Sequence, residues 1–184
     1  MPHSSACRSH PRVADRGDIL SLFIAVFPNE DARLDLKRQL PAHSRPTRPE
    51  KWHITLAFLN AVPDDRAEDV ARALSDVPPP GPITLHLTGG GRFGTVLWAG
   101  LAGDVDALAA FRQDLRSALI DAGFPIDERP FRPHLTVSYR FDHAIHRALH
   151  DYAGPSWPVT EFSLVRSADS EYHRLHTWPA RPAD

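Results

Sequence analysis

Two four-residue segments of this chain share the pattern His-x-Thr-apolar. The segment HITL occupies residues 53–56 inside an apolar run at 52–59, and HLTV occupies 134–137 at the start of a second run that ends at 139. Short apolar runs rich in β-branched and aromatic residues favour strands. On a strand, side chains two positions apart project from the same face. Each segment therefore predicts an imidazole beside a hydroxyl on one face, with apolar side chains on the other.

The elements expected around these two motif strands follow a repeated order. Strand, helix, motif strand, helix and strand occur from residue 18 to 88, and the same order recurs from 95 to 166 with one strand after it. We expect strands at 18–27, 52–59, 83–88, 95–101, 134–139, 159–166 and 172–178, helices at 29–40, 64–76, 105–122 and 142–151, and a turn at the three glycines 89–91.

The repeated order predicts an α+β fold of two pseudo-symmetric lobes, each a mainly antiparallel sheet with helices on its outer face. The motif strands would then face each other across a cleft between the lobes. The segment VPPPGP at 77–82 suits neither a helix nor a central strand, so we place the lobe boundary there. Residues 18–184 are expected to form this single bilobal domain.

Composition narrows the class of protein. The net charge is −2, which argues against a broadly basic nucleic-acid surface, and the single cysteine excludes both an internal disulfide and a thiolate metal cage. No apolar run approaches the roughly 20 residues that span a bilayer. Residues 1–17 contain few apolar side chains and are expected to be a disordered tail without the apolar core of a signal peptide. We expect a cytoplasmic monomer with no membrane segment.

The two motifs together suggest a reaction centre. Two imidazoles, His53 and His134, can act as general base and general acid near neutral pH. Two hydroxyls, Thr55 and Thr136, can donate hydrogen bonds to anionic oxygens. This combination suits an in-line displacement at phosphorus and requires neither a metal nor a cofactor. The residues alone leave open which histidine gives the proton and which takes it.

Three arginines are candidates for binding an anionic substrate. Arg132 lies two positions before His134, on the same face if the strand begins early, and could contact a phosphate. Arg45 and Arg48 lie in the proline-rich loop before the first motif and could line a basic rim for RNA. Solvated surface charges are the alternative for all three.

Aromatic residues and a further histidine cluster give weaker signals. Phe131 and Tyr139 are both candidates for stacking on a nucleobase, whereas strict alternation places Phe58 opposite the motif histidine, in the core. The last helix carries His143, His146 and His150 on one face. We interpret these as solvated side chains rather than a metal site, because three ligands from one short helix give poor tetrahedral geometry.

The paired motifs and their surroundings resemble the 2H phosphoesterases, and in particular the bacterial and archaeal RNA 2′,3′-cyclic phosphodiesterases, historically called 2′-5′ RNA ligases. The resemblance covers nearly the whole chain after residue 17. It rests on five segments in the family's order: SLFIAVFPNE (21–30), RPEKWHITLAFLN (48–60), GRFGTVLWAGL (91–101), AGFPIDERPFRPHLTVSYR (122–140) and FSLVRSADSEYHRLHTWP (162–179).

The resemblance implies an enzyme that hydrolyses RNA ends or nucleotides with a 2′,3′-cyclic phosphate to a 2′-phosphomonoester. By analogy with the family, His53 is the proton donor and His134 the proton acceptor, while Thr55 and Thr136 hold the non-bridging oxygens. Two other functions remain open. One is 2′-5′ RNA ligation, the reverse reaction with a 5′-hydroxyl RNA, and the other is nucleotide binding without turnover.

The sequence departs from the family pattern at two places. The flank of the second motif reads Ser138-Tyr139-Arg140, where the family favours an Ala-Arg or similar ending. The segment Ala168-Asp169-Ser170 contains no glycine, although the family's turn at this place usually does. Neither departure touches a motif histidine or threonine, so they bear on substrate preference more than on activity.

Overall fold

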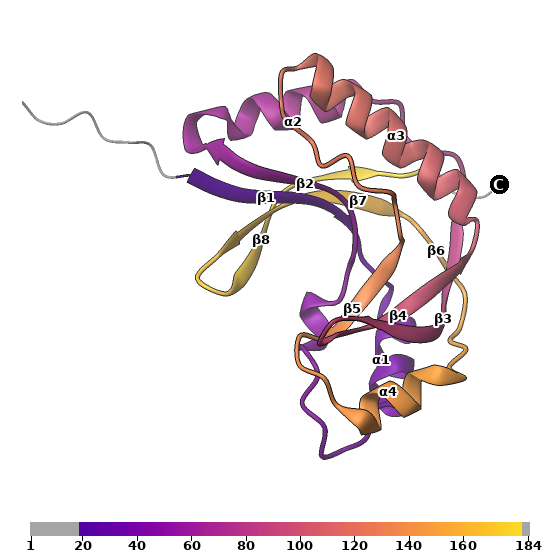
Figure 1. The fold of residues 1–184 in the computed structure, drawn as a ribbon. Helices are drawn as coiled ribbons and strands as arrows, with labels where there is room; N and C mark the ends of the chain where they lie inside the picture. Colours follow the sequence, from indigo (N-terminus) through magenta and orange to yellow (C-terminus); the bar gives the residue numbers. More distant parts are fainter. Residues whose placement is uncertain (1–18, 182–184) are drawn as a thin grey trace, which may run out of the picture.

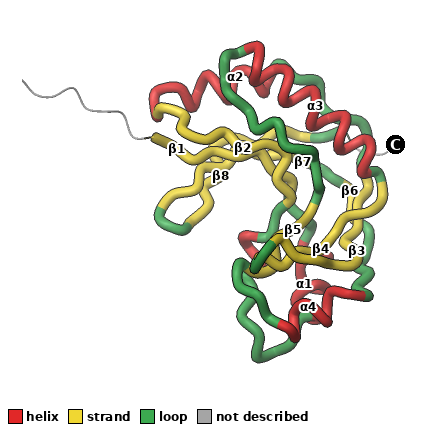
Figure 2. Tube along the Cα trace, in the orientation of Figure 1, coloured by secondary structure: helices red, strands yellow, loops and turns green. Residues whose placement is uncertain are grey.

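The computed structural model describes residues 19–181, which form a curled antiparallel sheet with α-helices around it (Figure 1; Figure 2). The expected tail, residues 1–17, lies outside the described residues. The strands are β1 (Ile19–Val26), β2 (Ile54–Pro63), β3 (Thr84–Phe93), β4 (Val96–Gly103), β5 (His134–Ser138), β6 (Trp157–Pro158), β7 (Glu161–Ala168) and β8 (Glu171–Pro179). The helices are α1 (Glu30–Gln39), α2 (Ala67–Ser75), α3 (Val105–Asp121) and α4 (His143–His150), with 3-10 turns at Pro49–Lys51 and Asp64–Arg66. The expected α+β class is confirmed.

The sheet has the strand order β6-β3-β4-β5-β2-β1-β7-β8 and bends between β5 and β2. In Figure 1, α2 and α3 cover the outer face of the half that contains β1, β2 and β7. Helix α4 lies against β3 and β4, and α1 lies beside α4, where the Gln39 side chain donates to the carbonyl oxygen of Ala148. The segment at 77–82 carries the chain from α2 to β3, and so from one half to the other. The chain later returns, because β7 pairs with β1. The halves therefore interleave along the sequence, whereas the repeated order predicts successive lobes.

Local sequence signals account for the helices. Asn29 caps α1, with its side-chain oxygen accepting a hydrogen bond from the backbone N–H of Ala32 at 2.9 Å. The longest helix, α3, buries Leu108, Leu115 and Leu119 at helical spacing, and ends before Gly123, whose φ is +82°. No helix within residues 19–181 is long and apolar enough to cross a membrane.

Each motif strand contains a β-bulge at the same motif position. The register between β1 and β2 skips Leu56, and the register between β4 and β5 skips Val137. Both are the fourth residue of their motif, and both are buried. An extra residue reverses the alternation beyond it. Phe58 and Tyr139, each five positions after a motif histidine, are therefore 42% and 58% exposed on the histidine side. The expectation that Phe58 packs into the core is wrong for this reason.

The three glycines at 89–91 lie inside β3 rather than in a turn. Gly89 has a φ of +59° at a shift in the β3–β4 register, which identifies it as a bulge. A Cβ atom on Gly90 would lie 2.5 Å from the Cβ atom of Leu149, so this glycine allows α4 to approach the strand closely. The turn lies instead at Gly94, also with a φ of +59°. Sequence pattern alone did not distinguish a glycine-rich strand under a helix from a turn.

Candidate active site

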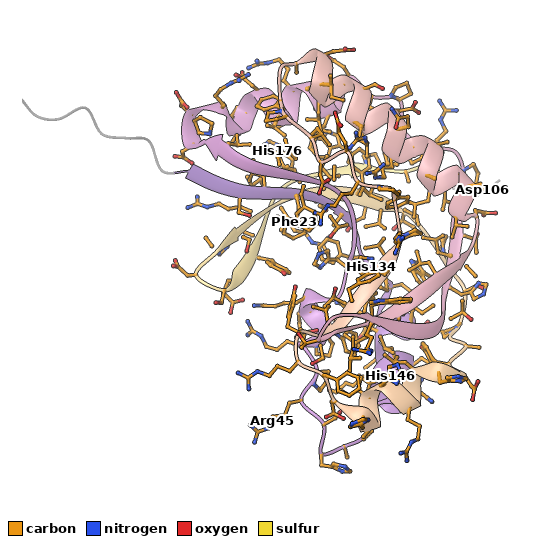
Figure 3. All side chains as sticks on the ribbon, in the orientation of Figure 1. Phe23, Arg45, Asp106, His134, His146 and His176 are labelled. Carbon is orange, nitrogen blue, oxygen red and sulfur yellow. The ribbon has the colours of Figure 1, made fainter. Side chains whose placement is uncertain are left out.

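The pairing of β2 with β5 brings the two motifs together. Ile54 pairs with Leu135 in an antiparallel register. Continuing this register by one residue in each direction places His53 opposite Thr136, and Thr55 opposite His134. Directly opposite side chains have Cβ atoms about 5 Å apart. All four side chains line one pocket of about 230 Å³. In Figure 3, the labelled His134 lies in the interior of the curl, between the two halves.

Both motif histidines are oriented by the same backbone contact. The Nδ1 atom of His53 lies 2.6 Å from the carbonyl oxygen of Lys51, and that of His134 lies 2.6 Å from the carbonyl oxygen of Arg132. A carbonyl oxygen only accepts hydrogen bonds, so Nδ1–H is the donor in each case. The Nε2 atom of each ring is then the one that accepts or releases a proton during a reaction.

Aromatic rings fix the position of each imidazole. His53 stacks on Phe23 with ring centroids 4.7 Å apart, and the edge of Tyr172 meets it at 5.3 Å. His134 meets Phe93 in a T-shaped contact at 5.1 Å. These neighbours leave each ring little rotational freedom, so each imidazole is held in one orientation.

The surroundings of His53 favour its neutral form. Burial lowers the pKa of His53 below its ordinary value, the hydrogen bond to the Lys51 carbonyl opposes this effect, and the charge of His134 lowers the pKa further. Protonation of His53 is therefore disfavoured while His134 carries a charge. Nearby, burial raises the pKa of Tyr172 to about 12, assisted by the charge of Tyr139 and a hydrogen bond to it, so this phenol keeps its proton at neutral pH.

A second, larger pocket of about 700 Å³ adjoins the motif pocket. The two pockets share Thr55, His134, Phe58 and Tyr139. The larger pocket continues past His134 and is also lined by the arginines and aromatic residues Arg112, Arg129, Arg132, Phe93 and Phe131. The site thus combines a small space holding the motif side chains with a wider space containing positive charge and exposed rings.

The family comparison agrees with this arrangement. The family described as the 2′-5′ RNA ligase superfamily matches residues 29–171, which include both motifs. The chain belongs to this superfamily. The resemblance to the 2H phosphoesterases is thereby confirmed.

Relatives within the superfamily extend the comparison. An RNA 2′,3′-cyclic phosphodiesterase of Geobacillus stearothermophilus is 36% identical over 98 residues, which cover 50% of this chain but only 31% of that relative. An RNA 2′,3′-cyclic phosphodiesterase of Escherichia coli K12 is 29% identical over 144 residues, covering 75% of this chain and 81% of that relative. The crystal structure of E. coli LigT in apo form has a TM-score of 0.73 at 25% identity, covering 89% of this chain and 99% of LigT.

Not every candidate residue from the sequence lines one of these two pockets. Arg132 and Phe131 line the larger pocket, and their role in substrate binding stays a prediction. Arg48 forms an ion pair with Glu171 at the start of β8 and lines neither pocket. Arg45 also lines neither pocket, and Figure 3 shows it extending outward from the loop at the opposite end of the molecule from α2. The structure therefore favours Arg132 over the two loop arginines.

Two residues that contact a motif strand or line the pockets were missed in the sequence. The Thr47 hydroxyl donates to the carbonyl oxygen of Val137 at 3.0 Å and accepts from Nε1 of Trp52 at 2.8 Å, which ties the loop before the first motif to the second motif strand. No local pattern in the sequence predicts this contact. Phe58 is the other missed residue, and the sequence did contain a signal for its position on the histidine side. It stands five positions after its motif histidine, as Tyr139 does after the second.

The helix histidines do not surround a common point. His143 and His146 meet the ring of Phe141 at 4.7 and 5.8 Å, and His150 lies 2.8 Å from the carboxylate of Asp151. Among residues 19–181, no three His, Cys, Asp or Glu side chains are grouped as a metal site. These imidazoles lie outside both pockets.

Proposed function

We propose that the protein hydrolyses RNA ends or nucleotides with a 2′,3′-cyclic phosphate to a 2′-phosphomonoester. The observation that carries this proposal is the convergence of His53, Thr55, His134 and Thr136 in one small pocket. The two curated relatives described above, both named RNA 2′,3′-cyclic phosphodiesterase, support the same substrate. A cyclic phosphate needs two proton transfers and stabilisation of its non-bridging oxygens, and the four side chains supply these groups.

The proposed reaction moves one proton onto the enzyme and one off it. Nε2 of His134 takes a proton from a water molecule, whose oxygen forms a new bond to phosphorus. The bond between phosphorus and the 3′ oxygen breaks, and Nε2–H of His53 protonates this leaving oxygen. The phosphate remains on the 2′ oxygen. Thr55 and Thr136 donate hydrogen bonds to the non-bridging oxygens, where negative charge increases in the transition state.

The assignment of His53 as donor has an electrostatic requirement. Its pKa is lowered in the free protein, so its imidazole must gain a proton once substrate is bound. An anionic phosphate beside the ring favours this, because a nearby negative charge stabilises the protonated form of the His53 imidazole. Binding of substrate thus offsets the effects of burial and of His134 on His53.

A leaving group that needs no proton tests which histidine is the donor. Nitrophenolate departs from a nitrophenyl phosphodiester without protonation, so His53→Ala should retain most of the wild-type activity on this ester while losing activity on a cyclic nucleotide. The His134→Ala variant should lose both activities. The reverse pattern would exchange the two roles.

The product identifies the reaction. Adenosine 2′,3′-cyclic phosphate is incubated with the protein in EDTA, and the product is compared with authentic 2′- and 3′-phosphates by phosphorus NMR. We expect adenosine 2′-phosphate. A 3′-phosphate would contradict the choice of leaving oxygen, activity lost in EDTA would contradict the metal-independent mechanism, and no product would favour nucleotide binding alone. Adding a 5′-hydroxyl RNA to the same mixture tests ligation.

A further inference from the structure

The larger pocket carries more positive charge than the chain as a whole. Arg112, Arg129 and Arg132 line it together with one carboxylate, Asp127, which gives +3 − 1 = +2. The whole chain has a net charge of −2. Positive charge concentrated in one concave region of an otherwise acidic protein attracts an anionic ligand to that region.

Two contacts hold the side chain of Arg112 in this pocket. Its Nε–H donates to the carbonyl oxygen of Leu56 at 2.9 Å, and its guanidinium lies over the ring of Phe131 at 4.7 Å. Leu56 is the bulge residue that follows Thr55, and Phe131 lies three positions before His134. The guanidinium therefore lies between the backbone of the first motif and the residues that precede the second motif.

The Arg112 guanidinium lacks a carboxylate partner. No Asp or Glu among residues 19–181 forms an ion pair with it, although the side chain is half-buried. Burial and the charge of Arg116, one helical turn away, lower the pKa of Arg112, and Asp127 offsets this effect. The Asp127 carboxylate is itself engaged by Arg129, with Nε 2.6 Å from Oδ2. Of the five N–H groups on Arg112, one is used within the described part of the chain, so the others can bind an anion.

Exposed aromatic rings surround the same space. Phe58, Phe93 and Tyr139 are 42%, 38% and 58% exposed, and all three line the larger pocket. Arginine beside exposed aromatic rings is the combination that binds single-stranded nucleic acid, because bases stack on the rings and phosphates pair with guanidinium. The 230 Å³ motif pocket is smaller than the roughly 300–1,000 Å³ typical of small-molecule sites, whereas the 700 Å³ pocket lies within that range.

We propose that the larger pocket binds the phosphodiester that joins the terminal nucleotide to the one before it, through Arg112 and Arg129. This inference rests on the proposed function, because it places the cyclic phosphate of the same RNA in the motif pocket. The enzyme would then distinguish the ends of RNA chains from free cyclic mononucleotides. An RNA end supplies the second phosphate, and a mononucleotide lacks it.

Three substrates test the subsite. They are a cyclic mononucleotide, a dinucleotide with a terminal 2′,3′-cyclic phosphate, and the same dinucleotide with an uncharged methylphosphonate linkage. For the wild type, we expect kcat/KM for the charged dinucleotide to exceed that for the methylphosphonate by about tenfold or more, as for loss of a charge-assisted contact. In Arg112→Met this ratio should fall close to one, and in Arg129→Met it should fall several-fold. The control Arg38→Met, at an exposed position on α1, should keep the wild-type ratio.

The ratio separates binding from folding, since both dinucleotides are measured on the same preparation. If Arg112→Met fails to fold, the ratio for Arg129→Met tests the subsite in its place, and it should fall several-fold. Equal rates on the charged and uncharged dinucleotides by the wild type would overturn the subsite, and so would a wild-type ratio in both arginine variants. If the wild type hydrolyses the cyclic mononucleotide but shows no preference for the charged linkage, the subsite alone is wrong. If it hydrolyses none of the three, the proposed function fails and the subsite with it.

Discussion

Ile54 of β2 pairs with Leu135 of β5, and this is the one registered pair between these strands in the described part of the chain. The pair lies at the centre of a two-fold-like arrangement. Continuing this register by one residue in each direction places each motif histidine opposite the threonine of the other motif, and each motif strand has its bulge at the fourth motif position. Two copies of a short pattern thus form one site through a single local pairing.

The aromatic rings that follow the bulges should contribute to substrate binding. We expect Phe58→Ala and Tyr139→Ala each to raise KM for a cyclic nucleotide about tenfold, because a base that stacks on an aromatic ring gains about 1–3 kcal/mol. Steady-state kinetics on purified variants measures the change. Phe141→Ala is the control, since its ring is 38% exposed and lines neither pocket. An unchanged KM in both test variants would show that the base does not stack on these rings.

The same bulges explain which side-chain positions could be predicted from the sequence and which could not. Alternation correctly placed His53 and Thr55 on one face, because it depends only on the local strand geometry. It placed Phe58 wrongly, because a bulge is fixed by pairing with a neighbouring strand and no local composition marks it. The contact of Thr47 with Val137 joins residues 90 positions apart, so local sequence could not predict it either.

The pairing of strands that are distant in sequence also could not be predicted from local patterns. The order of strands and helices followed from periodicity, capping residues and prolines. Which strand lies beside β1 is decided by the whole chain, and the answer, β7, lies far away in sequence. The two-residue strand β6 is too short for any periodic signal and exists through its pairing with β3.

The lowered pKa of His53 should make stability depend on pH. The unfolded chain binds a proton at this imidazole near pH 6.5, whereas the folded protein binds it only at lower pH. Stability from the neutral ring is therefore present above pH 6.5 and is lost as the pH falls below that value towards the folded pKa. Between pH 7.5 and 5.5, the wild type should lose more unfolding free energy than His53→Gln in urea titrations. Replacing the exposed His143 by Gln should keep the wild-type response, and parallel curves for the wild type and His53→Gln would contradict the expectation.

The β7–β8 turn is a place where a substitution should stabilise the protein. Asp169 and Ser170 have φ values of +51° and +60°, which glycine adopts more easily than serine. We expect Ser170→Gly to raise the free energy of unfolding by about 0.5–1 kcal/mol, since relief of the left-handed conformation is partly offset by a more flexible unfolded chain. Lys51 donates to the backbone carbonyl of Ser170, which glycine keeps.

Urea denaturation of Ser170→Gly and of a control, Ser156→Gly, measures this effect. Ser156 lies in an exposed loop and has a negative φ, so glycine there should give no gain. A Ser170→Gly variant that is no more stable than the wild type would show that the turn conformation is not a source of strain.

Single-turnover hydrolysis of adenosine 2′,3′-cyclic phosphate by His53→Ala and His134→Ala tests the central claim most directly. The claim is that the two motif histidines share the proton transfers, so each variant should be slower than the wild type by about 10²–10⁴-fold while circular dichroism shows an intact fold. His143→Ala, at an exposed position on α4, should keep the wild-type rate. A rate within tenfold of the wild type in either motif variant would contradict the claim.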